Sequence, residues 1–84
     1  MARLIFDSAR KHGIADDDIN HAMDNAMVWR PEEERLLYLG GDRAGMMLEV
    51  VSIITEDLDE IVIHAMPMRR RYEPMLRGHG EQDA

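Results

Sequence analysis

The stretch Ile61-Val-Ile-His-Ala-Met-Pro-Met-Arg-Arg-Arg-Tyr72 carries most of the information about the fold of this chain. Its first six residues are typical of a buried strand, and Pro67 is suited to the first position of a helix that follows. His64 and the cluster Arg69–Arg71 would then lie close together. Guanidinium groups held at the end of a strand suit a phosphate ligand, so this segment predicts a site as well as a fold.

Length and composition set limits on the domain organisation. The chain has 84 residues, of which 45% are hydrophobic, and it has no cysteine. A chain of this size without disulfides must bury nearly all its aliphatic side chains or rely on a partner. We expect a single domain over residues 1–77 and a disordered tail over residues 78–84, which are small and polar. The lack of cysteine and of a long apolar run favours a cytoplasmic protein without a membrane span.

The charge of the chain restricts how it can bind nucleic acid. The formal net charge is −7, so the field of the whole molecule repels a polyanion. Any binding of RNA must therefore use a local patch, and Arg69–Arg71 with Arg77 form such a patch near the C-terminus. The histidines show no pair at metal-ligand spacing on a common helix, so we expect neither a metal nor another cofactor.

Two helices are expected before the strands begin. The first covers Ala2–His12 and stops at Gly13, although a short strand over Leu4–Phe6 followed by a shorter helix is the competing interpretation. The second begins at Asp16 or Asp17 and ends near Ala26–Val28, because aspartates suit a helix N-terminus and an apolar stripe follows at helical spacing.

The remainder of the chain predicts strands and a last helix. The expected strands are Val28–Arg30 at an edge, Arg35–Leu39, Met46–Thr55 and Ile61–Met66, joined by a hairpin loop over Gly40–Gly45 and a turn over Glu56–Glu60. Short connections make this an antiparallel meander. Pro67 should start a C-terminal helix whose Met68 and Tyr72 face the protein, and Pro74 should end or kink it. The predicted fold class is α+β, with two N-terminal helices packed on a three- or four-stranded antiparallel sheet and a short C-terminal helix.

Strand register determines which side chains share a surface. Regular hairpins would place Leu39 opposite Met46 and Ile54 opposite Ile61. Alternation then assigns to the helix-covered face Leu37, Leu39, Met46, Leu48, Val50, Ser52, Ile54, Ile61, Ile63 and Ala65. The opposite face receives Leu36, Tyr38, Met47, Glu49, Val51, Ile53, Val62, His64 and Met66. Tyr38, Glu49 and His64 would therefore lie on one surface, with Glu49 and His64 as diagonal neighbours.

A carboxylate, an imidazole, a phenol and guanidinium groups on one surface can cleave RNA without a metal. Glu49 or His64 would deprotonate the 2′-hydroxyl, the other would protonate the leaving oxygen, and arginine would stabilise the phosphorane. Tyr38 would supply a supporting hydroxyl. A purely structural role for His64, hydrogen-bonded to Glu49 or Tyr38, is the alternative interpretation. Likewise, the arginines can be the solvated side of a helix.

The motifs in this order resemble those of the BrnT-type toxins, within the RelE-like superfamily of toxin–antitoxin ribonucleases. Ser8-Ala-Arg-Lys-His-Gly-Ile14 is similar to the Lys-His-Gly-Val turn of that family, and the final strand leads, as there, into an arginine-rich helix. The resemblance implies RNA contacts by Lys11, His12, Arg35 and the cluster Arg69–Arg71. His12 before Gly13 also has a simpler interpretation, as a cation at a helix C-terminus.

This chain departs from the family pattern at the strand end. Ala65-Met66 stands where the family has Ala-Arg, and His64 stands where it usually has serine. Three functions are therefore expected as alternatives. The first is an endoribonuclease toxin held by a DNA-binding antitoxin. The second is a catalytically inactive module that docks such a partner, and the third is a homodimer formed through the second face of the sheet.

Overall fold

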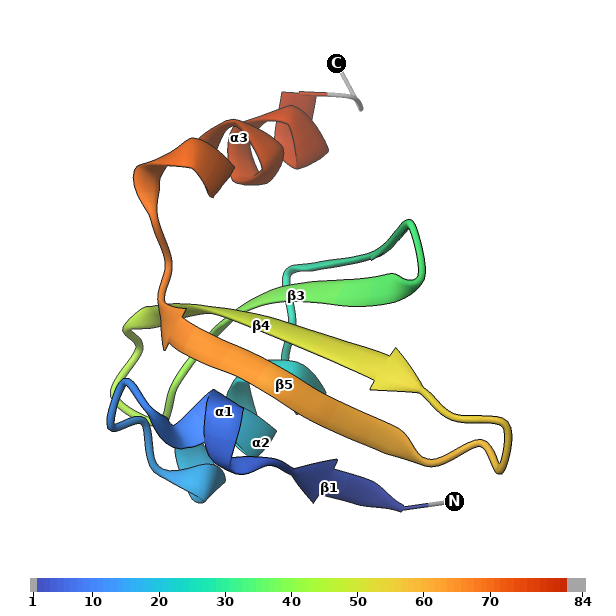
Figure 1. The fold of residues 1–84 in the computed structure, drawn as a ribbon. Coiled ribbons are helices and arrows are strands. Elements are labelled where there is room, and N and C mark those ends of the chain that lie inside the picture. Colours follow the sequence, from blue (N-terminus) through green and yellow to red (C-terminus); the bar gives the residue numbers. More distant parts are fainter. Residues whose placement is uncertain (1, 82–84) are drawn as a thin grey trace.

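The structure, a computed structural model, describes residues 2–81, in which one sheet lies between two layers of helix (Figure 1). The strands are β1 (Arg3–Ile5), β2 (Val28–Glu32), β3 (Arg35–Gly41), β4 (Met47–Ile54) and β5 (Glu60–Pro67). The helices are α1 (Asp7–Arg10), α2 (Asp16–Asp24) and α3 (Glu73–Glu81), and the 3₁₀ turn η1 (Arg70–Tyr72) precedes α3. Within the described residues, no helix is both long enough and apolar enough to span a membrane.

The sheet is mixed and five-stranded, in the order β1-β5-β4-β3-β2. β1 runs parallel to β5, pairing Arg3 with Glu60 and Ile5 with Val62, while the other pairs are antiparallel. The predicted purely antiparallel sheet of three or four strands was therefore wrong in strand number and in character. The α+β class is confirmed.

The first residues form a strand because they cover an otherwise open edge of β5. The backbone N–H of Phe6 donates to the carbonyl of Val62, and that of Glu60 donates to Ala2, which continues the ladder at both ends. The predicted helix over Ala2–His12 was wrong, and the competing strand with a shorter helix describes this segment. Gly13 follows the end of the helical segment as expected, with a φ of 78° that glycine adopts at little cost.

α1 and α2 cover one face of the sheet and bury the larger core. That core comprises Ala9, Ile19, Ala22, Met23, Tyr38, Leu48, Val50, Val62 and Ala65. α2 packs so closely on β3 that a Cβ at Gly40 would lie 2.1 Å from the carbonyl oxygen of Ala22. A glycine in β3 is therefore a requirement of helix-on-sheet packing, in addition to any role in the hairpin.

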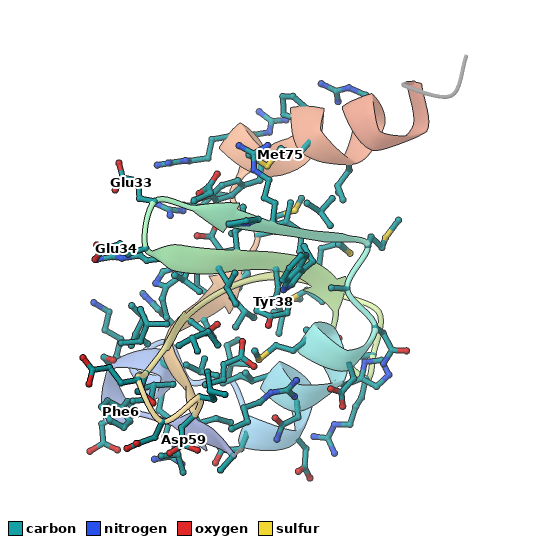
Figure 2. All side chains as sticks on the ribbon, turned by 90° about the vertical axis from the view of Figure 1, so that its right-hand side faces the viewer. Phe6, Glu33, Glu34, Tyr38, Asp59 and Met75 are labelled. Carbon is teal, nitrogen blue, oxygen red and sulfur yellow. The ribbon has the colours of Figure 1, made fainter. Side chains whose placement is uncertain are left out.

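α3 and the segment before it cover the opposite face. Leu37, Leu39 and Tyr72 are buried there, with Val28, Met47, Val51, Met68, Met75 and Leu76 packed against them. Figure 2 shows this second helical layer with Met75, at the other end of the molecule from Phe6 and Asp59. The expectation that Met68 and Tyr72 face the protein is confirmed.

Both prolines near the C-terminus were assigned wrong positions. Pro67 ends β5 opposite Leu48 instead of starting a helix, and the N–H of Met68 extends the pairing to Met47. Pro74 lies in the first turn of α3 instead of ending a helix, because a first-turn residue needs no backbone donor.

The expected domain boundary at residue 77 falls inside α3, and residues 82–84 of the expected tail lie outside the described residues.

The register of the β3–β4 hairpin differs from the regular one. Leu39 lies opposite Glu49 instead of Met46, and the pairing begins at Gly41 and Met47. The cause is Asp42, whose Oδ1 accepts hydrogen bonds from the backbone N–H groups of Ala44 at 2.9 Å and Met46 at 2.8 Å. These bonds close a loop over residues 42–46 in place of the expected loop over Gly40–Gly45. As a result Leu37 and Leu39 lie under α3, and Leu36 and Tyr38 lie on the α1–α2 face.

The β4–β5 hairpin contains two irregularities that cancel. The turn is one residue shorter than expected, so that Ile54 pairs with Glu60 instead of Ile61. A β-bulge then follows, because Val51 pairs with His64 and Ser52 with Val62, which leaves Ile63 as the extra residue. Beyond the bulge the pairing of Glu49 with Met66 is the one that regular hairpins predict. Before it, Val62 turns to the α1–α2 face.

Candidate functional site

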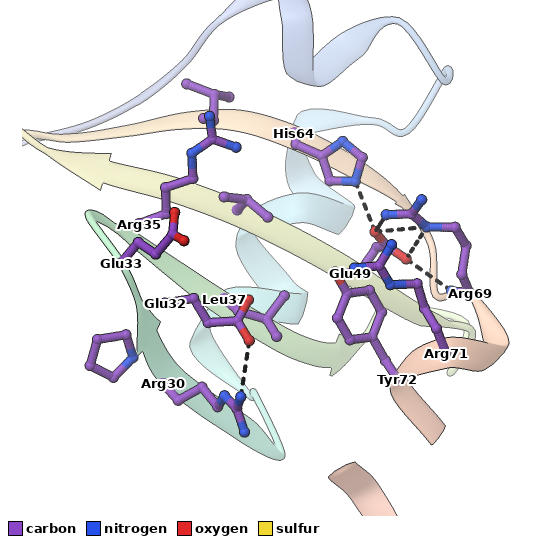
Figure 3. A pocket seen from close by; sticks show the side chains of 13 residues that line it. Arg30, Glu32, Glu33, Arg35, Leu37, Glu49, His64, Arg69, Arg71 and Tyr72 are labelled. Atoms are coloured by element: carbon purple, nitrogen blue, oxygen red, sulfur yellow. Dashed lines mark hydrogen bonds and ion pairs between the residues drawn. The ribbon is translucent and has the colours of Figure 1, made fainter. Parts of the chain in front are cut away.

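A cleft of about 880 Å³ opens on the α3 side of the sheet (Figure 3). It is lined by Arg30, Pro31, Glu32, Glu33, Arg35, Leu37, Glu49, Val51, Ile63, His64, Arg69, Arg71 and Tyr72. The strands supply its floor, the β2–β3 hairpin one wall, and the segment entering η1 the other. Figure 2 shows Glu33 and Glu34 at the tip of that hairpin.

Glu49 is the buried centre of the site, with a side chain that is 0% exposed. Its Oε1 accepts the backbone N–H of Arg69 at 2.9 Å and Nε at 3.0 Å, and its Oε2 lies 2.7 Å from Nη2. The same Oε2 lies 3.0 Å from Nε2 of His64. A buried carboxylate needs this many partners, because without them the loss of hydration would not be offset.

The charge state of Glu49 follows from two opposed effects. Burial by itself raises the pKa of the carboxyl group, since the charged form loses its hydration. The hydrogen bonds from the side chain and backbone of Arg69, with a further one from His64, outweigh burial, so that the pKa lies below its ordinary value. Glu49 is therefore ionised at neutral pH and is saturated with donors.

His64 is the part of this cluster that solvent and ligands can reach. Its side chain is 26% exposed at the edge of the cleft, and Glu49 holds one of its ring nitrogens. An imidazole with one nitrogen on a carboxylate keeps the other for proton transfer. The ring of His12 lies edge-on to it, with the two centroids 6.0 Å apart and an angle of 79° between the ring planes.

The arginines of the cleft differ in the contacts that their side chains make. Arg69 is held by Nε and Nη2, and its side chain is still 46% exposed. Cζ of Arg71 lies 5.0 Å from the centroid of the Tyr72 ring, at cation–π distance. Arg35 is exposed and lines the cleft, whereas Arg30 pairs with Glu32 at 3.1 Å.

The predicted site residues separate into three groups. Glu49, His64, Arg69, Arg71 and Arg35 come together around the cleft, as expected. Lys11, His12 and Arg70 are exposed and do not line the cleft. The ring of His12 nevertheless contacts the ring of His64 at the cleft edge. Tyr38 is in a different place altogether.

The prediction that Tyr38 shares a surface with Glu49 was wrong. Its hydroxyl donates to Glu60 on the α1–α2 face, where Ser52 also donates to the same oxygen at 2.6 Å. Burial, followed by the contact with Glu60, raises the pKa of the Tyr38 phenol. The reason for the misplacement is the loop closed by Asp42, which turns every side chain of β3 to the other face.

The ion pair between Glu49 and Arg69 was missed from the sequence. A signal was present, because Leu48-Glu49-Val50-Val51 places one carboxylate inside an otherwise apolar strand. Such a carboxylate requires a cation nearby. Because β4 and β5 are antiparallel, the arginines that follow β5 lie near Glu49 at the start of β4 and are the candidates. The contact between His12 and His64 had no comparable signal, since it depends on where α1 crosses β5. Among the side chains that the structure describes, those of residues 2–77, no group of three or more His, Asp or Glu is arranged to hold a metal ion.

The crystal structure of the ribonuclease toxin BrnT from Brucella abortus, determined at 1.1 Å resolution, is similar to this chain with a TM-score of 0.62. The match covers 83% of this chain and 99% of BrnT, at 18% sequence identity. The fold is BrnT-like. The chain matches no protein-family model, and no curated protein matches it in sequence. At this identity the likeness to BrnT concerns the fold, and the role of each residue must come from the geometry of the site.

Proposed function

We propose that this protein is a toxin-like, metal-independent endoribonuclease whose active site is the cleft beside α3. The observation that carries the proposal is the contact of His64 with the buried, ionised Glu49 at the edge of an arginine-lined cleft. The BrnT-like fold supports the proposal, because the similar structure, BrnT, is that of a ribonuclease toxin.

The proposed reaction is transesterification within the RNA strand. The 2′-hydroxyl loses its proton and attacks the neighbouring phosphorus, the bond from phosphorus to the 5′-oxygen breaks, and that oxygen takes up a proton. The products are a 2′,3′-cyclic phosphate and a free 5′-hydroxyl. Arg35, Arg69 and Arg71 bind the phosphate and stabilise the negative charge of the phosphorane. His64 carries one of the two proton transfers.

Glu49 acts in this proposal by positioning other groups. Its side chain has no exposed surface, so a bound RNA cannot reach it in this conformation. It orients the ring of His64 through Nε2 and fixes the guanidinium of Arg69. The hydrogen bonds from Arg69 to Glu49 do not involve Nη1, which leaves that group for a phosphate oxygen.

We further propose that a partner controls this activity. The partner would be a DNA-binding antitoxin encoded beside the protein, and the exposed Trp29 and Met27 next to the open edge of β2 offer apolar surface for a contact. Co-expression of the neighbouring gene tests this point, since a cognate antitoxin should co-purify and suppress cleavage.

The activity is tested with purified protein and a structured RNA in the presence of EDTA. Wild-type protein should generate 2′,3′-cyclic phosphate ends, and His64→Ala should lower the cleavage rate at least 100-fold, the contribution expected of an acid–base group. His21→Ala is the matched control, because His21 is an exposed residue of α2 that bonds to the carbonyl of Gly41 in β3 and does not line the cleft. Equal rates for the two variants would contradict the proposal.

A second candidate is a non-catalytic binding module with the same fold. It is favoured by the net charge of −7 and by the engagement of the Arg69 guanidinium with Glu49, which both weaken RNA binding. This candidate predicts intact RNA together with a stable complex with a DNA-binding protein. The homodimer expected through the second face of the sheet is not available in this form, because α3 and the segment before it cover that face. A homodimer would have to pair through the edge strand β2 instead, and sedimentation as a monomer would remove this variant.

A further inference from the structure

The position of His12 is a consequence of the short first strand. β1 pairs only with Glu60 to Val62 of β5, so beyond that point another element must flank the edge of β5. α1 does so, and Oγ of Ser8 donates to the carbonyl of Ile63, the bulged residue, at 2.8 Å. The turn after α1 thereby places the exposed His12 beside the ring of His64.

The proposed reaction needs two groups in opposite protonation states. One must be able to accept the proton of the 2′-hydroxyl while the other already carries a proton for the leaving oxygen. Glu49 cannot be the second group, because it is fully buried and its oxygens accept hydrogen bonds from Arg69 and His64. The exposed imidazole beside the ring of His64 is that of His12, and an imidazolium can donate a proton.

We infer that His12 is the general acid of the reaction and His64 the general base. This inference rests on the proposed ribonuclease function and adds the second catalytic residue to it. Glu49 accepts a hydrogen bond from Nε2 of neutral His64, so Nδ1 of that ring is the nitrogen that takes the proton of the 2′-hydroxyl. Protonated His12 gives its proton to the 5′-oxygen as the bond to phosphorus breaks. Solvent then restores both rings.

The surroundings of the two rings suit these different roles. His64 faces the carboxylate of Glu49 and lies in the same cleft as the guanidinium groups of Arg35, Arg69 and Arg71. His12 stands outside that cleft on an exposed turn, next to Lys11. Its side chain can therefore turn towards a phosphodiester at the cleft edge and exchange protons with water between turnovers.

The test compares two substrates that differ in their leaving group. One is an RNA oligonucleotide, whose 5′-oxygen needs an acid, and the other is uridine 3′-(p-nitrophenyl phosphate), whose leaving group departs without one. His12→Ala should cleave the oligonucleotide at least 100-fold more slowly than wild type and the nitrophenyl ester less than 10-fold more slowly. His64→Ala should lose at least 100-fold on both.

The pH profile provides the second readout. Wild-type kcat/KM on the oligonucleotide should be bell-shaped, and His12→Ala should lose the alkaline limb, which reports deprotonation of the acid. His12→Gln should behave like His12→Ala, while His21→Ala should keep the wild-type profile. Binding of a 2′-deoxy oligonucleotide should weaken far less in His12→Ala than the cleavage rate falls, which separates proton donation from affinity.

The outcomes separate this assignment from the function on which it rests. Wild-type protein that cleaves neither substrate would overturn the ribonuclease function and this assignment together. Cleavage by wild type, with His12→Ala retaining the alkaline limb or losing both substrates equally, would overturn the assignment of His12 alone.

Discussion

Nη2 of Arg69 lies 2.7 Å from Oε2 of Glu49, and the backbone N–H of Arg69 lies 2.9 Å from Oε1. One carboxylate of β4 therefore holds both the main chain and the side chain of Arg69, two residues after the end of β5. The segment leading into α3 is attached to the floor of the cleft at this point. Stability and the geometry of the site should accordingly change together here.

Removal of the Arg69 side chain should destabilise the fold. Arg69→Ala leaves Glu49 buried with fewer donors, and we expect a loss of about 2–3 kcal/mol, below that for a fully buried pair because Arg69 is half-exposed. Arg70→Ala is the matched control, since its side chain is exposed, and should lie within about 0.5 kcal/mol of wild type. Urea unfolding measures both, and equal stabilities would contradict a structural role for the pair.

The stabilisation by Glu49 should disappear in acid. Its pKa in the folded protein lies below the ordinary value of 4.5, so the carboxylate contributes stability above that value, and the contribution is lost as the pH falls through the folded pKa. The difference in unfolding free energy between wild type and Glu49→Gln, measured from pH 7 to pH 3, should therefore shrink as the pH falls below 4.5. A difference that is constant over the whole range would show that the charge of Glu49 is not involved.

A methyl group at position 40 should be far more harmful than one at position 41. In Gly40→Ala the new Cβ would come within 2.1 Å of the backbone oxygen of Ala22, so α2 must move away from β3. We expect a loss of about 3 kcal/mol or more, at the upper end for overpacking. In Gly41→Ala the nearest atom is 3.7 Å away, which is an ordinary contact. Thermal unfolding of the two variants gives the comparison, and similar values would argue against close packing of α2.

The hydroxyl of Tyr38 should matter for stability and not for the cleft. Tyr38→Phe removes the hydrogen bond to Glu60 and should lower the unfolding free energy by about 1–2 kcal/mol. Because this network lies on the α1–α2 face, RNA cleavage at a temperature well below unfolding should equal that of wild type. A folded Tyr38→Phe protein with much reduced cleavage would contradict the separation of the two faces.

The elements that the sequence predicted well are those with a strong local signal. The acidic start of α2, the stop at Gly13 and the four antiparallel strands follow from capping, glycine and alternation. β1 was given only as an alternative, because three residues carry little periodicity and their partner is distant in sequence. The position of η1 and α3 likewise depends on packing against β3 and β4, which no local pattern contains.

The site illustrates how register errors decide functional predictions. Tyr38 was assigned to the wrong face because the side chain of Asp42 sets the length of the first hairpin loop. Glu49 and His64 were assigned to the right one, although the turn and the bulge at Ile63 each deviate by one residue. The two deviations have opposite sign, so the pairing of Val51 with His64 is restored where the site begins.

The bulge at Ile63 divides β5 into two parts, because the alternation of side chains between the two faces of the sheet shifts by one residue there. Near Glu60 its side chains serve the helical core, and near His64 they serve the cleft. If the strand kept Ile63 but paired it with Val51, without the bulge, the imidazole of His64 would turn inward and Ile63 would take its place on the cleft side. The length of β5 alone therefore does not decide which way the histidine faces, because the same residues can pair with or without the bulge.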